Sequence, residues 1–108
     1  MHMKDMIKPP YYAVIFKSKI NEEDNGYAKM AKALVMEAEK QHGFLGADSV
    51  RAADGTGITV SYWVSMESID NWKRHALHIK AKELGKHIWY ESYSIQICRV
   101  ESDNWFPF

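Results

Sequence analysis

The chain has 108 residues, of which 46% are hydrophobic and 13% aromatic, which suffices for one domain with a packed core and argues against disorder. Its 14 basic and 14 acidic residues cancel, so the composition disfavours binding that depends on neutralising nucleic-acid phosphates or an anionic membrane. The single cysteine, Cys98, excludes an intrachain disulfide and favours the cytoplasm, and no apolar run approaches the roughly 20 residues of a membrane span.

The first half of the chain predicts a strand, a helix and a second strand. Residues 11–18 are rich in aromatic and β-branched side chains and are apolar on both alternating faces, so both faces of this strand must be covered. Apolar residues then recur at helical spacing over 27–38, and Gly43 is placed for a left-handed C-terminal cap. A weaker strand follows over 44–51.

The next part of the chain predicts a hairpin and a second helix. Asp54-Gly55 is a turn signal between the strand at 44–51 and a third strand at 58–65. Ser65 is suited to cap the N-terminus of the helix that follows. This helix is expected to run through Ile69, Trp72, Ala76 and Ile79 and to end near Leu84-Gly85.

Residues 89–100 alternate well enough to predict a fourth strand. One face would carry Trp89, Tyr93, Ile95 and Ile97, and the other Tyr90, Ser92, Ser94, Gln96 and Cys98. The third strand has its own polar row, which includes Thr59 and Ser61. Such rows either line a cavity or a wet interface, or they mark an exposed margin of the sheet.

The order of these elements is β-α-β-β-α-β, which predicts an α+β fold of the ferredoxin-like type with a four-stranded antiparallel sheet. We expect a single domain over 1–108, with a core at about 7–101, a short N-terminal lead and an aromatic C-terminal tail. Two helices can cover only one face of such a sheet. The doubly apolar first strand and the tail therefore predict a homodimer that packs sheet to sheet.

The second predicted helix carries the residues best suited to catalysis or ligand binding, which are Trp72, His75 and His78. At helical spacing Trp72 and His75 lie about 60° apart at the border of the apolar stripe, and His78 lies nearer its polar edge. These residues could be a core indole, a partly buried imidazole and a solvated imidazole. Alternatively, the imidazoles could move protons or bind substrate in a crevice between helix and sheet.

The same residues do not predict a metal site. His75 and His78 could share an ion, but no carboxylate or cysteine stands at a helical spacing that completes a set of three ligands. Cys98 has no evident activating neighbour and is expected to be an inert thiol.

Several segments in this order resemble the antibiotic biosynthesis monooxygenase domain family over about residues 7–101. They are residues 7–16, the Gly-Phe-Leu-Gly turn at 43–46, residues 57–63, Trp72-x-x-His75-x-x-His78 and Trp89-Tyr90. The resemblance implies a dimeric α+β barrel. Members of that family include oxygenases that act on polycyclic aromatic quinols without metal or flavin, and haem-degrading enzymes. The resemblance therefore implies one of these activities.

For cofactor-free oxygenation, the pocket must favour the substrate anion, orient it and exclude water. His75 is then the candidate base, and Trp72 and Trp63 are candidate aromatic walls. Tyr62 or Tyr90 could donate a hydrogen bond to a substrate oxygen, and His78 is a further candidate for substrate binding.

Two alternatives stay open, a non-catalytic dimer that binds a small ligand and a haem-binding or haem-degrading protein. The haem-degrading relatives have an axial His about ten residues beyond the helix Trp, where this chain has Lys82, and an Asn on the first strand, which 11–18 lacks. The sequence therefore favours an oxygenase without a cofactor that acts on a small aromatic molecule.

Overall fold

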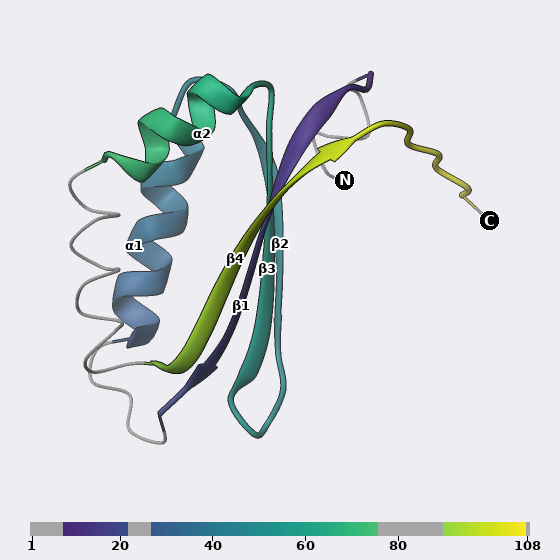
Figure 1. Cartoon of the computed structure of the whole chain (residues 1–108). Coiled ribbons are helices and arrows are strands. Elements are labelled where there is room, and N and C mark those ends of the chain that lie inside the picture. The colour runs from purple at the N-terminus through teal and green to yellow at the C-terminus, as the bar shows by residue number, and fades with distance from the viewer. Residues whose placement is uncertain (1–7, 22–26, 76–89, 108) are drawn as a thin grey trace.

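The computed structural model describes residues 8–21, 27–75 and 90–107. Its elements are β1 (Tyr11–Ile20), α1 (Tyr27–Glu39), β2 (Phe44–Arg51), β3 (Thr56–Trp63), α2 (Met66–Lys73) and β4 (Tyr90–Val100). The strands form one four-stranded antiparallel sheet in the order β2-β3-β1-β4 (Figure 1). The predicted ferredoxin-like α+β fold is confirmed. None of the helices in the described ranges is both long and apolar enough to cross a membrane.

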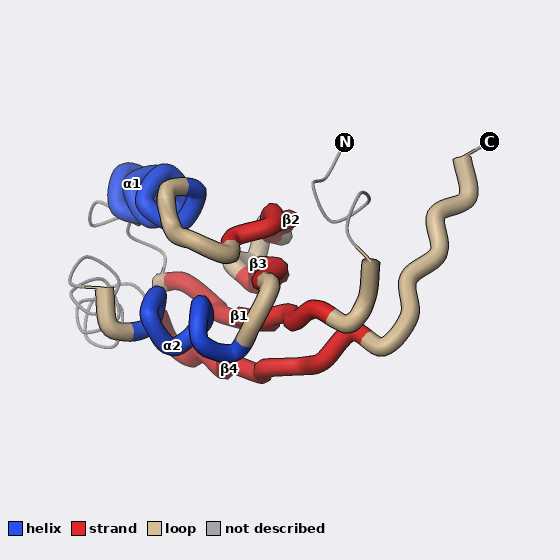
Figure 2. The backbone as a smooth tube through the Cα atoms, turned by 90° about the horizontal axis from the view of Figure 1, so that it is seen from above, coloured by secondary structure: helices blue, strands red, loops and turns tan. Residues whose placement is uncertain are grey.

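β1 lies in the centre of the sheet and fixes which side chains share a face. Phe16 pairs with Thr59 of β3 and with Ile95 of β4, and these three side chains therefore stand on one face. Both helices lie on that face (Figure 2). The other face carries Tyr11, Ala13, Ile15, Val60 and Tyr62.

The face without helices is only partly covered. Tyr11 and Ala13 are 2% and 6% exposed, and the Tyr11 hydroxyl donates a hydrogen bond to Asp103 Oδ2 at 2.5 Å. Toward the other edge, Val50 and Ile58 are 72% and 39% exposed. The segment after β4 thus shields one end of this face, and the sheet-to-sheet dimer stays a prediction.

The predicted hairpin turn and the predicted N-cap at Ser65 are confirmed, whereas Gly43 lies four residues beyond the end of α1 at Glu39 and so is not at the position of its C-terminal cap. Asp54 accepts a hydrogen bond from the backbone N–H of Thr56 at 2.9 Å, and Gly55 has φ +92°. Ser65 and Ser68 form a reciprocal capping box at the start of α2. Gly43 has φ +89°, and a Cβ there would lie 2.6 Å from Ser68 Cβ, so only glycine fits at this position.

The predicted extent of the second helix is wrong. The helix ends at Lys73, so His75 lies just beyond it and not on its surface. The N–H of Arg74 still bonds to Asp70 O at 3.2 Å, but the N–H of His75 bonds to Trp72 O at 3.0 Å. This last bond spans three residues instead of four, so the final turn tightens and the α-helix stops. The rest of the predicted helix, to Leu84-Gly85, lies outside the described residues.

The predicted face of Tyr90 is also wrong. The β1–β4 pairing shifts so that Lys19 faces Ser92 while Ile20 faces Tyr90, which leaves Glu91 as an extra residue in β4. This bulge moves Tyr90 to the helix-covered face, beside Tyr93, because it interrupts the strict alternation of the strand. Trp89 lies outside the described residues.

Candidate active site between the helices and the sheet

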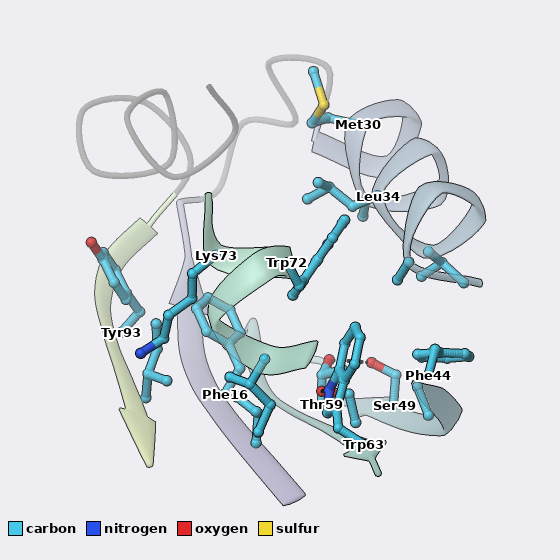
Figure 3. A pocket seen from close by; sticks show the side chains of 18 of the residues that line it. Phe16, Met30, Leu34, Phe44, Ser49, Thr59, Trp63, Trp72, Lys73 and Tyr93 are labelled. Carbon is cyan, nitrogen blue, oxygen red and sulfur yellow. Dashed lines mark hydrogen bonds between the residues drawn. The ribbon is translucent and has the colours of Figure 1, made fainter. Parts of the chain in front are cut away.

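A cavity of about 220 Å³ lies between the two helices and the sheet (Figure 3). α1 contributes Met30, Ala31, Leu34, Val35 and Ala38. α2 contributes Ile69, Trp72 and Lys73. The sheet contributes Val14, Phe16, Phe44, Ala47, Ser49, Thr59, Ser61, Trp63, Tyr90, Tyr93 and Ile95. The walls are mostly apolar and aromatic, as in sites for small organic molecules.

Trp63 anchors the aromatic wall at the end of β3. Its side chain is fully buried, and its Nε1–H donates to Ser61 Oγ at 2.9 Å. Trp72 stacks with Trp63 at a ring-centroid distance of 6.2 Å and an interplanar angle of 25°. Phe44 meets Trp63 edge-on at 5.4 Å. The two predicted indoles thus form one wall, held in place by packing and by a satisfied hydrogen bond.

His75 packs against Trp72 but does not line the cavity. Its imidazole stacks with Trp72 at 5.6 Å and 29°, and its Nε2 lies 3.7 Å from Glu37 Oε2 on α1. Its Nδ1 is buried and has no hydrogen-bond partner in the described part of the chain. His75 is not among the cavity-lining residues, so it contacts the site through Trp72.

Glu37 is a site residue that sequence reasoning missed. Its carboxylate, 30% exposed, also lies 3.3 Å from Lys40 Nζ, so a carboxylate, an imidazole and an ammonium meet near the C-terminal ends of α1 and α2. Its position three residues after Leu34 and next to Ala38 places it at the border of the apolar stripe of α1. That border position was the available signal.

A second aromatic group lies where β1 meets β4. Phe16 stands 5.4 Å from Tyr90 and 5.7 Å from Tyr93 between ring centroids, and the two tyrosines are 5.6 Å apart. Of these three cavity-lining residues, only Tyr90 was a predicted site residue.

Another predicted site residue, Tyr62, does not line the cavity. Tyr62 points to the helix-free face, where it meets Tyr11 edge-on at 6.1 Å, because neighbouring residues of a strand face opposite ways and Trp63 faces the cavity. His78 lies outside the described residues.

Most hydroxyl groups of the β2–β3 wall are already paired. Ser49 Oγ and Thr59 Oγ1 are hydrogen-bonded to each other, and Ser61 accepts from Trp63. Thr59 and Ser61, from the polar row of β3, line the cavity. The polar row of β4 does not share this role, because its residues Ser92, Ser94 and Gln96 are exposed.

The described residues do not fit a haem or metal site. Among them, no group of three or more His, Cys, Asp and Glu side chains could hold a metal ion. The nearest imidazole, His75, directs Nε2 at Glu37 and buries Nδ1, so neither nitrogen reaches the cavity.

Comparisons with known proteins agree with this fold. Residues 11–102 match the family model of the monooxygenase af470-like proteins. The uncharacterized protein YqjZ of Bacillus subtilis (strain 168) is 52% identical over 99 residues, which span 92% of this chain and 87% of that protein.

Solved structures share the fold at low identity. A variant of SnoaB, a cofactor-independent oxygenase from Streptomyces nogalater, superposes with a TM-score of 0.74 at 6% identity, covering 86% of this chain and 95% of that one. An antibiotic biosynthesis monooxygenase superposes with a TM-score of 0.70 at 13% identity, covering 81% and 95% of the two chains. At such identities the likeness concerns the fold alone.

Proposed function

The chain belongs to the monooxygenase af470-like family, and from this we propose that it is a small monooxygenase that oxidises a flat aromatic or quinol-like molecule without a cofactor. The expected likeness to antibiotic biosynthesis monooxygenase domains is confirmed at the level of family and fold. The cofactor-independent oxygenase of the same fold, SnoaB, supports the absence of a cofactor in the proposal.

The observation that carries the proposal is the aromatic cavity with a titratable pair at its border. Trp72 offers a partly exposed planar surface on which a flat ring can stack, the fully buried Trp63 supports that indole, and the surrounding apolar side chains exclude water. His75 and Glu37 stand directly behind Trp72. A flat substrate and a proton acceptor are the two components that oxygenation without a cofactor requires.

The proposed reaction converts an acidic ring methylene group of the substrate to a carbonyl group. A base removes a proton from the substrate, and the resulting anion passes one electron to O2. The radical pair recombines to a peroxide, which loses water. One oxygen atom of O2 thus enters the new carbonyl group, and the other leaves as water with the two hydrogen atoms of the methylene group. The protein supplies proton transfer, orientation and a dry site, while the electron-rich substrate supplies the electrons.

Five side chains take part in the proposed reaction, and each has a different role. His75 is the proposed proton acceptor, and one water molecule carries the proton to it because its imidazole does not line the cavity. Glu37 holds the imidazole in place through its contact with Nε2. Trp72 holds the ring, Trp63 supports Trp72, and the Tyr90 hydroxyl donates a hydrogen bond to a substrate oxygen. Because His75 lies behind Trp72, the first mutational test must separate a base from a mere support for the indole.

We also propose that the protein acts as a homodimer joined through the helix-free sheet face. The apolar side chains there, including Ile15, Ile58 and Val60, have no helix over them in the described structure (Figure 2). A second copy would cover them symmetrically.

Oxygen consumption by the purified protein tests the function. The protein, stripped of metals with a chelator, is mixed with a panel of quinols and anthrone-like phenols. Uptake above the spontaneous rate is expected without added flavin, metal or haem. Ligand binding without uptake would instead indicate a binding protein, and a Soret band after haem addition would favour haem chemistry.

A further inference from the structure

Lys73 is the one charged residue among the described side chains that line the cavity. It is the last residue of α2 and is partly buried. Figure 3 shows its side chain pointing from α2 toward β4. On that side the cavity is bounded by Phe16, Tyr93 and Ile95, so the ammonium group approaches a wall of aromatic and aliphatic carbon.

The contacts of this ammonium group differ from those of other lysines. Within the part of the chain that the structure describes, Lys73 forms no ion pair or side-chain hydrogen bond, whereas Lys19 and Lys40 each stand near a glutamate, at 3.7 and 3.3 Å. The C-terminal end of α2 favours a cation nearby, but it does not use the three N–H donors of the ammonium.

A cation beside an apolar cavity attracts anions more strongly than one in water, because the surrounding medium screens the charge less. It also forms hydrogen bonds to an anionic oxygen that are stronger than those between neutral groups. The hydroxyl groups of Ser49, Thr59 and Ser61 on the cavity wall are neutral donors, so each binds an anionic oxygen less strongly than the ammonium group does.

We infer that Lys73 is a specificity-determining residue that binds an anionic oxygen, a carboxylate or phenolate, carried by the aromatic ligand. The aromatic part lies against Trp72, which Trp63 supports, and the anionic group lies at the β4 side of the cavity. This inference rests on the proposed function because it uses the same cavity, and it narrows the ligand class from flat aromatics to acidic ones.

Calorimetric titration with a matched pair of ligands tests the inference. The probes are 2-naphthoate and 2-naphthamide, which share the ring system and differ in charge. The wild-type protein is expected to bind the naphthoate about tenfold more tightly, as one charge-assisted contact allows. Lys73→Met should remove this preference and leave the affinity for the amide nearly unchanged, because methionine retains the apolar stem. Lys73→Arg should keep the preference.

The control is Lys32→Met, which removes an exposed lysine of α1 that does not line the cavity and should change neither affinity. Equal weakening of both ligands by Lys73→Met would overturn the inference, because the side chain would then act only by packing. Equal binding of both ligands to the wild type would overturn it even if the variant fails to fold, and would leave the cavity proposal standing. Binding of neither ligand would overturn both.

Discussion

The imidazole of His75 stacks with the indole of Trp72, with ring centroids 5.6 Å apart and planes inclined by 29°. Trp72 lines the cavity and His75 does not, so the histidine can influence a bound molecule either through a proton or through the position of the indole. Glu37, 3.7 Å from His75 Nε2, ties this pair to α1. The cavity wall, the titratable pair and the contact between the helices are therefore one structural unit.

Replacing His75 separates the two roles. We expect His75→Ala to lower the rate of oxygen uptake about 100-fold, the usual contribution of a positioned base, with little change in the Kd of 2-naphthamide. Oxygen electrode traces and calorimetry give the two quantities. His42→Ala, at an exposed histidine after α1, is the control. An unchanged rate would remove His75 from the mechanism, and a parallel loss of binding would make it a support for Trp72.

Glu37 is expected to act only through His75. Glu37→Gln keeps the size of the side chain and removes the charge, so it should lower the rate less than His75→Ala. In the His75→Ala background the same change should have almost no further effect, because residues that work as a unit are not additive. Additive losses in this double-mutant cycle would show that the two residues act independently.

Truncating Trp72 should damage both the wall and the fold. We expect Trp72→Ala to lower the free energy of unfolding by about 2 to 3 kcal/mol, which is less than for a fully buried aromatic residue because the side chain is only partly buried. Trp72→Phe should restore most of the stability and part of the affinity for 2-naphthamide. Urea unfolding and calorimetry check both. Wild-type affinity in Trp72→Ala would mean that the ligand does not stack on this indole.

The N-terminal cap of α2 makes a separate prediction about stability. Ser65→Ala removes the acceptor for the Ser68 N–H and should lower the free energy of unfolding by about 1 kcal/mol. Ser92→Ala, at an exposed position of β4, should change it by less than about 0.5 kcal/mol. Equal effects in urea melts would contradict the role of the capping box.

The hairpin turn predicts a pH dependence. Hydrogen bonds from Thr56 hold the pKa of the Asp54 carboxyl below its ordinary value of 3.8. A carboxyl with a lowered folded pKa stabilises the fold above its unfolded pKa, and this contribution is lost as the pH falls through the folded pKa. The stability difference between wild type and Asp54→Ala should therefore shrink below about pH 3.8. A difference that grows on acidification would contradict this assignment.

Local patterns were enough to predict the order of the elements, the hairpin turn and the Ser65 cap. Each depends on residues close together in the sequence, such as Asp54 with Gly55 or Ser65 with its helix. The aromatic wall was also predictable, because Trp63 is the last residue of β3 and only a short connection separates it from α2, which carries Trp72.

The features that were wrong or missed depend on contacts between distant segments. Tyr90 changes face because β4 has one residue more than β1 at Glu91, and neither strand alone reveals this. Glu37 becomes a site residue only when α1 approaches His75. Lys73 was not singled out from the sequence, because the predicted helix continued past it and only the packing of α2 against the sheet places it beside the cavity.

The most direct test of the central claim is the incorporation of isotopically labelled O2 by metal-stripped protein, measured by mass spectrometry of the product. We expect one labelled oxygen atom in the new carbonyl for each O2 consumed, a rate that exceeds the spontaneous oxidation, and loss of that excess in His75→Ala. A substrate that binds but acquires no labelled oxygen above the spontaneous background would contradict the account.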